Sequence, residues 1–444
     1  MKTEPEQRSV LGLRQNLPQF ILLIVVNAFV GAMIGIERSI FPEFAAFKFN
    51  IHSTSIVLSF IVIFGFSKAI ANYFSGYLAA IYTRKKVLLL GWILALPVPL
   101  IFIYAPSWNW IIFANVLLGI HQGFAWSSTV VMKIDLVGQQ NRGLAMGLNE
   151  FAGYIAVALM AFFTAYIADR FGLFPFPFYL GLGVAVFGLL ITWVFVKDTS
   201  GFVEAESHST SHIPRLKNVF TATSFTNKNL SSVTQAGLVN NLNDGMVWGL
   251  LPILLSQKHF SILDIGVVTA IYPAVWGLSQ IVTGKLADLV PKKKLLFWGM
   301  LLQALAIAYL IFASNYFQMI LVSILLGIGT AMVYPTFLAT ISDYTHAYDR
   351  AKSLGIFRFW RDSGYAIGAI ITGLTADYFG ASFSIIIIAA LTSIFSKSLN
   401  TVRQSRTALY FQGSSILRSS NLYLSIGMSK SVPFAQRVSH LLSL

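Results

Sequence analysis

Charged and polar side chains interrupt the apolar stretches of this chain at a few positions where they could bind an ion or a polar molecule. Lys68 lies in the middle of one such stretch, and Asn72 follows it at helical spacing on the same face. Asp244 is the lone carboxylate of another stretch and lies close to Asn241. Burying an unpaired charge is costly. We therefore interpret these residues as candidate binding residues, with internal pairing as the structural alternative.

Five further residues are candidates for the same role. Glu37 and Arg38 are adjacent near the end of the first apolar stretch, so they point in different directions on a helix. His121 has a side chain whose ordinary pKa suits proton exchange. Trp276 and Gln280 lie four residues apart and extend an aromatic face of their stretch. An interfacial ion pair, a packing histidine and packing aromatic residues remain open as alternatives.

The composition is that of a membrane protein. Of the 444 residues, 56% are hydrophobic and only 11% are charged, and the mean hydropathy is +0.71. A soluble domain carries about 25% charged residues. The net charge of +14 comes from short loops between apolar stretches, so we attribute it to membrane topology and not to nucleic-acid binding. The chain contains no cysteine, which excludes disulfides and cysteine-ligated metals.

Twelve stretches are long enough to cross a bilayer, which requires about 20 apolar residues. We place them at 18–41, 56–81, 87–104, 109–132, 145–168, 176–197, 230–256, 264–287, 293–312, 317–341, 357–376 and 382–402.

The distribution of lysine and arginine predicts the orientation. With the N-terminus inside, the inner loops carry most of the cations: Arg84, Lys85, Lys86, Lys133, Arg142, Lys292, Lys293, Lys294, Arg350 and Lys352. The outer loops carry little more than Lys48, Arg170 and Lys258. This asymmetry predicts that both termini lie in the cytoplasm. The membrane in which we expect the protein is the inner cell membrane.

The chain also repeats itself at a distance of 208 residues. The sequence Leu-Leu-Gly-Ile occurs at 117–120 and again at 325–328, and Ala-Asp-x-Phe-Gly occurs at 168–172 and again at 376–380. A repeat kept in register over such a length indicates two copies of one unit. We expect a first half at 1–197, a cytoplasmic linker at 198–228, a second half at 229–403 and a disordered cytoplasmic tail at 404–444.

Local motifs connect this architecture with a known family. Gly284-Lys285-Leu286-Ala287-Asp288 precedes Lys292-Lys293, and the first copy keeps Gly76 and Arg84-Lys85. Asp-x6-Arg follows the fourth and the tenth stretch, as Asp135 with Arg142 and as Asp343 with Arg350. These features resemble the major facilitator superfamily of secondary transporters. The resemblance implies an all-α membrane fold of two pseudo-symmetric six-helix bundles.

The charged motif residues predict a cytoplasmic gate between the halves. Charges at helix ends can bridge neighbouring helices, and acids contribute little to topology. The gate that we expect consists of Arg84, Lys85, Asp135, Arg142, Glu150, Asp288, Asp343, Arg350, Arg358, Arg361 and Asp362. For the cations alone, a purely topological role remains open, and for the charges of the fifth and eleventh stretches, a surface position.

The function that we expect is transport of a small molecule by alternating access, coupled to protons. Lys68 and Arg38 favour a small organic anion or zwitterion as substrate. The alternative is a multidrug/proton antiporter, although 147–154 lacks the Pro and the Gly-Gly of the helix-five motif in such proteins. The chain has no Gly-x-x-x-x-Gly-Lys loop for ATP, no His-Glu-x-x-His and no paired carboxylates on one helical face. We therefore expect a monomeric transporter without metal or cofactor, not an enzyme.

Overall fold

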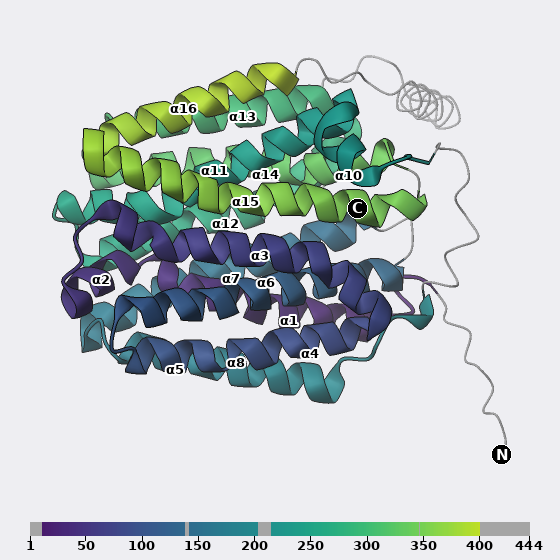
Figure 1. The fold of residues 1–444 in the computed structure, drawn as a ribbon, viewed down its shortest axis with the longest axis horizontal. Coiled ribbons are helices and arrows are strands. Elements are labelled where there is room, and N and C mark those ends of the chain that lie inside the picture. Colours follow the sequence, from purple (N-terminus) through teal and green to yellow (C-terminus); the bar gives the residue numbers. More distant parts are fainter. Residues whose placement is uncertain (1–10, 138–141, 203–214, 346, 400–444) are drawn as a thin grey trace, which may run out of the picture. The chain divides into compact units, whose positions relative to one another are not determined.

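The computed structural model describes residues 11–137, 142–202, 215–345 and 347–399. The predicted tail at 404–444 and the middle of the predicted linker lie outside this range. Helices account for nearly all of the described residues. We call the end where α1 begins and α16 ends the near end, and the opposite end, where α2 lies, the far end (Figure 1).

The described residues of the first half form eight helices. They are α1 (Leu17–Arg38), α2 (Phe41–Phe49), α3 (Thr54–Ile81), α4 (Arg84–Ala95), α5 (Pro97–Tyr104), α6 (Trp108–Val137), α7 (Arg142–Phe171) and α8 (Phe176–Phe195). α4 and α5 together make one crossing. They are separated at Leu96 because Pro97 has no backbone N–H for the helix ladder.

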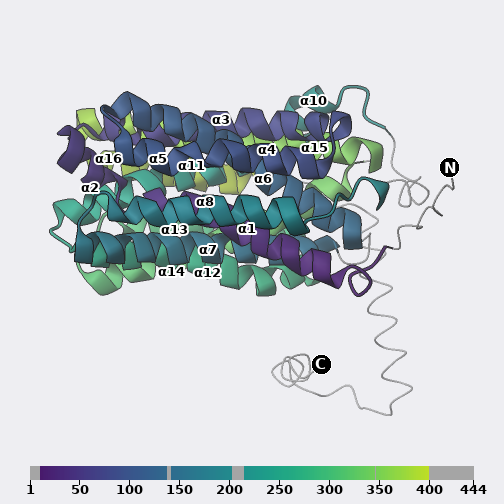
Figure 2. The same ribbon diagram turned by 90° about the horizontal axis from the view of Figure 1, so that it is seen from below.

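The second half repeats the pattern after two short elements. These are α10 (Val219–Thr221) and the π-helical turn η2 (Ala222–Thr226). The long helices are α11 (Lys228–Gln257), α12 (Ile262–Leu289), α13 (Lys292–Tyr309), α14 (Tyr316–Asp343), α15 (Ala347–Phe379) and α16 (Ala381–Ser398). The helices lie side by side along one direction, which Figure 2 shows from a second side.

The twelve predicted stretches coincide with these long helices, and eleven of them agree within about five residues at each end. The exception is α15, which begins at Ala347 instead of residue 357. Its first turns are polar, so the hydropathy pattern does not reveal them. The prediction that Lys133 lies in a loop is wrong as well. Lys133 lies within α6, is buried, and donates to the carbonyl of Leu23 at 3.0 Å.

Two helix pairs make most of the contacts between the halves in the described structure. α3 packs against α15, and α7 packs against α12. Close approach of α3 and α15 depends on Gly65, where an added Cβ would lie 2.8 Å from the backbone N of Ala366. Within the first half, α1 and α7 cross at Gly31, where a Cβ would lie 2.1 Å from the carbonyl oxygen of Gly153. Both crossings bring helix backbones together and so position the polar side chains between them.

By length and composition, seven segments of the described chain can cross a membrane: α1, the first 22 residues of α3, α4 with α5, most of α7, α8, most of α12 and most of α14. The other long helices carry more polar residues or are shorter. Large apolar side chains such as Trp193 and Phe195 are more than 60% exposed, as expected for a surface that lipid covers.

Candidate functional site

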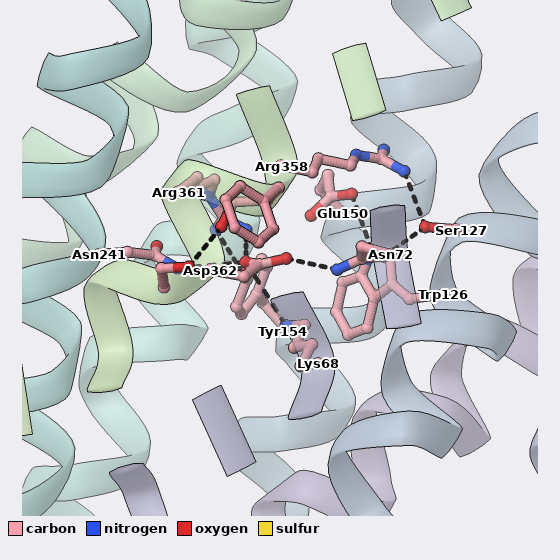
Figure 3. A network of polar contacts seen from close by, with 12 residues as sticks. Lys68, Asn72, Trp126, Ser127, Glu150, Tyr154, Asn241, Arg358, Arg361 and Asp362 are labelled. Atoms are coloured by element: carbon pink, nitrogen blue, oxygen red, sulfur yellow. Dashed lines mark hydrogen bonds and ion pairs between the residues drawn. The ribbon is translucent and has the colours of Figure 1, made fainter. Parts of the chain in front are cut away.

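A small polar pocket lies between the halves at mid-length of the helices. α3, α6 and α7 of the first half and α14 and α15 of the second half line it (Figure 3). Its lining residues are Lys68, Asn72, Trp126, Ser127, Glu150, Tyr154, Tyr334, Arg358, Arg361 and Asp362. The free volume is only about 10 Å³, which is about the least that holds one water molecule. The side chains therefore fill the site themselves, and a ligand would have to replace their mutual contacts.

Asp362 is the centre of this network (Figure 3). Its Oδ1 accepts from Arg361 at 2.8 Å and from the amide of Asn241 at 3.3 Å. Its Oδ2 accepts from the amide of Asn72 at 2.5 Å. The ammonium of Lys68 lies 4.0 Å from Oδ1. Because Lys68 and Asn72 belong to α3, one carboxylate connects the two halves through several contacts.

Lys68 has an aromatic environment as well as this ion pair. Its Nζ lies 5.4–5.7 Å from the ring centres of Phe64, Trp126 and Tyr365, a distance at which an aromatic face attracts a cation. The helical spacing of Lys68 and Asn72 predicted one shared face. In the structure both side chains are directed at Asp362 of the second half.

Arg361 adds a second cation beside Asp362. Its guanidinium lies 4.3 Å from the ring centre of Tyr334 and donates to the hydroxyl of Tyr154 at 3.4 Å. Tyr154 in turn stacks on Trp276, with ring centres 3.6 Å apart and planes 27° apart. Trp276 belongs to α12, so this stack is another contact between the halves.

Arg358 and Glu150 complete the charges of the pocket. Arg358 is half-buried and donates to the hydroxyl of Ser127 at 3.2 Å. Glu150 accepts from the indole of Trp126 at 2.9 Å and from Asn149 at 3.0 Å, so its hydrogen bonds stay within the first half. One of its carboxylate oxygens is buried without a hydrogen-bond partner in the described structure.

Helix geometry explains why these residues share a site. Arg361 and Asp362 follow Arg358 by three and four residues, and Tyr365 follows them by four and three, which places all four on one face of α15. We expected Glu150, Arg358, Arg361 and Asp362 at the inner ends of their helices, as gate partners. The structure places them well inside α7 and α15, because both helices begin several residues before the apolar stretch.

A second buried polar cluster lies toward the far end. Glu37 and Arg38 are buried, 3.8 Å apart, and neither carboxylate oxygen of Glu37 has a hydrogen-bond partner among the described residues. Arg38 lies 5.0 Å from the ring centre of Trp248 on α11. Asp244 is buried, accepts from the hydroxyl of Tyr272 through one oxygen, and leaves the other oxygen without a partner in the same range.

The remaining candidates from the sequence lie outside the pocket. His121 is buried against α4, where its Nδ1 lies 3.0 Å from the carbonyl of Gly91 and its ring lies 4.8 Å from that of Trp92. Gln280 is buried, and its amide has no hydrogen-bond partner in the part of the chain that the structure describes. Asn240 and Asn243 bond to Gln303, as expected for polar contacts between helices.

At the near end, the described motif residues interact within the first half. Arg84 Nε lies 2.6 Å from Asp135, which also accepts from Thr199 at 2.8 Å. The Nζ of Lys85 donates to the carbonyl of Trp193 at 3.0 Å. These contacts connect α4 with α6 and α8, and they do not bridge the halves. The predicted gate side chains of Arg142, Asp288, Asp343 and Arg350 lie outside the described residues.

Sequence reasoning missed Trp126, Ser127 and Tyr154. Tyr154 follows Glu150 by four residues on one helical face, which was an available signal. Trp126 and Ser127 carry no charge and stand in an apolar helix, so no pattern in the sequence distinguishes them from packing residues.

Comparisons with known proteins agree with this architecture. The family model described as Major Facilitator Superfamily matches residues 20–230 and 233–407. The proton-coupled antiporter flippase LtaA of Staphylococcus saprophyticus is 22% identical over 403 residues, which is 88% of this chain and 95% of that protein. The multidrug resistance protein MdtG of Salmonella typhi is 24% identical over 364 residues, 79% of this chain and 86% of that protein. The nucleoside transporter NupG has a similar fold, with a TM-score of 0.70 at 11% identity, over 87% of this chain and 100% of that chain.

Proposed function

Because the chain belongs to the Major Facilitator Superfamily and is an integral membrane transporter, we propose that it carries a small organic anion or zwitterion by alternating access. The transport is coupled to protons, and the substrate binds in the pocket around Asp362. The observation that carries this proposal is the charge of that pocket. Lys68, Arg358 and Arg361 line it together with two carboxylates, those of Glu150 and Asp362.

One cation of this pocket, Arg358, is available to bind an anionic group. Asp362 is shared between Lys68 and Arg361, while Arg358 donates only to the neutral hydroxyl of Ser127 among the hydrogen bonds described. An unpaired guanidinium beside a pocket is a good anchor for a carboxylate, because its fork of N–H groups matches two oxygens. A zwitterion would place its ammonium near the free oxygen of Glu150.

The division of the pocket between the two halves supports alternating access. Asn72, Lys68 and Ser127 belong to the first half, and Asp362 and Arg358 belong to the second. When the halves separate at one end, these contacts must break, which leaves buried charges without partners. A bound anion replaces Asp362 as the partner of the cations, so occupied and empty sites favour different arrangements of the halves.

The carboxylates of the far-end cluster supply the proton sites of the proposal. Asp244 and Glu37 are buried, and one oxygen of Asp244 and both oxygens of Glu37 have no hydrogen-bond partner in the described structure. Protonation removes the cost of burying these charges. The motion of the halves changes their exposure, so proton binding and substrate binding are linked through one conformational equilibrium.

The second candidate function is export of drugs in exchange for protons. Two observations favour it: the likeness to MdtG, and the flat aromatic stack of Tyr154 on Trp276 beside the pocket. A cationic aromatic compound could bind against such rings. The surplus of cations in the pocket argues for the anion instead.

The experiment is a thermal-shift screen of the purified protein against matched organic anions, zwitterions and cationic dyes. A ligand that binds only the folded state raises the melting temperature. Arg358→Ala should weaken binding of the best anion by about 10- to 100-fold, the equivalent of a hydrogen bond to a charged group. Lys352→Ala, an exposed cation on the same helix, is the control and should bind as the wild type does.

Transport is tested in proteoliposomes with an imposed pH gradient. Uptake that requires ATP and ignores the gradient would contradict proton coupling. If cationic dyes stabilise the protein and no anion does, the substrate is a cationic drug and not an organic anion.

For the placement in the cell we propose the inner membrane, with both termini in the cytoplasm. The positive charge at the helix starts of the near end, which include Arg84, Lys85 and Lys292, supports this orientation. We also propose that the unit of transport is the monomer, since both halves of the pocket come from one chain.

A further inference from the structure

The far end of α15 is bound to the first turn of α3 through one carboxylate. Asp377 Oδ1 accepts from the backbone N–H of Thr54 at 2.8 Å. Its Oδ2 accepts from the backbone N–H of Ser55 at 3.0 Å and from the hydroxyl of Ser53 at 2.9 Å, and the hydroxyl of Ser55 bonds to the same oxygen. We call these four hydrogen bonds the Asp377 clasp.

The chemistry of the clasp is that of an anion at a helix N-terminus. The first turn of a helix has N–H groups without partners within the helix, and it carries a positive partial charge. Partial burial raises the pKa of Asp377, but the hydrogen bonds from Ser55, Ser53 and Thr54 outweigh it, and the pKa lies below its ordinary value. The carboxylate is therefore ionised at neutral pH, and its bonds to α3 are charge-assisted.

The repeat places the same residues on the other pair of joining helices. Ser53 corresponds to Ser261 at the start of α12, and Asp377 corresponds to Asp169 near the end of α7, each 208 residues away. There the contact is not formed. Ser261 bonds to Asp264 of its own helix, and the side chain of Asp169 is exposed. The two seams between the halves thus differ at the far end although their helices correspond.

We propose that Asp377 is a positioning residue for the transport cycle, which latches the α3–α15 seam at the far end and leaves the α7–α12 seam without a latch. The inference rests on the proposed alternating access. When the far end opens, the clasp must break, so its strength sets how often the far end opens. The backbone contact next to it, where a Cβ on Gly373 would lie 2.8 Å from the Cα of Ser55, holds the two helices in register.

The test uses the fact that the chain contains no cysteine. Leu58→Cys introduces a single thiol at the far end of α3, where the buried Leu58 packs against Gly249 of α11, a second-half helix that lies beside the α3–α15 seam. Ala270→Cys introduces one into the buried contact of α12 with α7. The rate of reaction with a water-soluble thiol reagent, measured on protein in nanodiscs without substrate, reports how often each seam opens. This measurement requires no transport, so it tests the Asp377 latch even if the proposed transport function is wrong.

In the Leu58→Cys background, Asp377→Ala should speed labelling by about threefold or more, because charge-assisted hydrogen bonds are lost. Asp169→Ala, the matched control at the corresponding position, should leave the rate unchanged. In the Ala270→Cys background, Asp377→Ala should have a clearly smaller effect than at the α3 seam.

A second variant covers the case in which Asp377→Ala does not fold. The pair Ser53→Ala and Ser55→Ala keeps the carboxylate but removes both hydroxyl donors, and it should speed labelling in the same direction. Unchanged labelling in both variants would overturn the proposal. Equal acceleration by Asp169→Ala, or at both seams, would overturn the claim that only one seam is latched.

Discussion

Removing Asp362 should destabilise the protein more than removing Lys68, although the two form one ion pair. Asp362→Asn leaves Lys68 and Arg361 buried without their shared counter-ion. Lys68→Met leaves Asp362 with Arg361, Asn72 and Asn241. The difference arises because Asp362 has two cationic partners and Lys68 has one anionic partner; the distance between Lys68 and Asp362 does not cause it.

The structure sets the magnitudes. At the 4.0 Å between Lys68 and Asp362, two unit charges attract by about 4 kcal/mol at an effective dielectric constant of about 20. Removing the lysine also removes the cost of burying an ammonium, so we expect Lys68→Met to cost about 1 kcal/mol. Breaking a buried pair from the side that leaves charges unpaired costs about 3–5 kcal/mol, which we expect for Asp362→Asn.

The assay is a double-mutant cycle on the free energy of unfolding, measured by denaturant titration in one detergent at pH 7. Asp362→Asn alone leaves two cations, Lys68 and Arg361, without a counter-ion, whereas the double variant leaves only Arg361. Asp362→Asn should therefore cost about 1–2 kcal/mol less when Lys68 is already methionine. Lys68→Ala with Asp244→Ala serves as the control. Because Asp244 bonds to Tyr272 and not to Lys68, the loss of unfolding free energy from Asp244→Ala should simply add to the loss from Lys68→Ala.

Two results would refute this reasoning. Equal costs for Lys68→Met and Asp362→Asn would show that Asp362 is not the shared counter-ion. A rescue of Lys68→Ala by Asp244→Ala would show that the lysine pairs with the far-end cluster in the folded protein.

Three further predictions follow from other parts of the molecule. Asp244→Asn should abolish accumulation driven by a pH gradient while exchange of substrate across proteoliposomes persists; normal accumulation would move the proton site to Glu37. Gly31→Ala should cost about 1–3 kcal/mol of unfolding free energy, because its Cβ would lie 2.1 Å from a backbone oxygen of α7, whereas Gly183→Ala, with no atom within 4 Å, should be neutral or stabilising. Burial raises the pKa of Asp198, but bonds from the backbone of Lys85 and from Ser200 outweigh it and lower the pKa. Its contribution to stability is thus present above the ordinary pKa of about 4 and is lost as the pH falls through the lower, folded value. The melting temperature of Asp198→Asn should therefore lie below that of the wild type at pH 7, and the two should converge in acid.

The sequence predicts the helices well because each membrane crossing requires a long apolar stretch. The failure at α15 has a physical cause. Charged residues such as Asp349 and Lys352 lower the hydropathy of its first turns, yet both fit a helix there, because Asp349 accepts a hydrogen bond from the backbone N–H of Leu216 and Lys352 is exposed. A hydropathy pattern counts these charges as loop residues because it contains no information about their partners.

The candidate site was predictable only in part for a similar reason. Lys68 is recognisable because a buried cation requires a partner, and the sequence offered both Asp244 and Asp362 for this role. The choice depends on how α3 and α15 are rotated against each other, and the contact at Gly65 determines that rotation. His121 shows the opposite case, since an ionisable side chain in an apolar helix here meets only a carbonyl and an aromatic ring.

Glu150 and Arg358 correspond to each other in the repeat and line the same pocket. If two identical subunits had formed this pocket, the residue at these positions would meet its own copy across the symmetry axis. The result would be two acids or two bases in a space of about 10 Å³, where like charges repel strongly. At this pair of positions a homodimer is thus confined to uncharged residues or to the cost of repulsion. Joining the copies into one chain removes that restriction, and the opposite charges at these two corresponding positions are a property that only the fused protein can have.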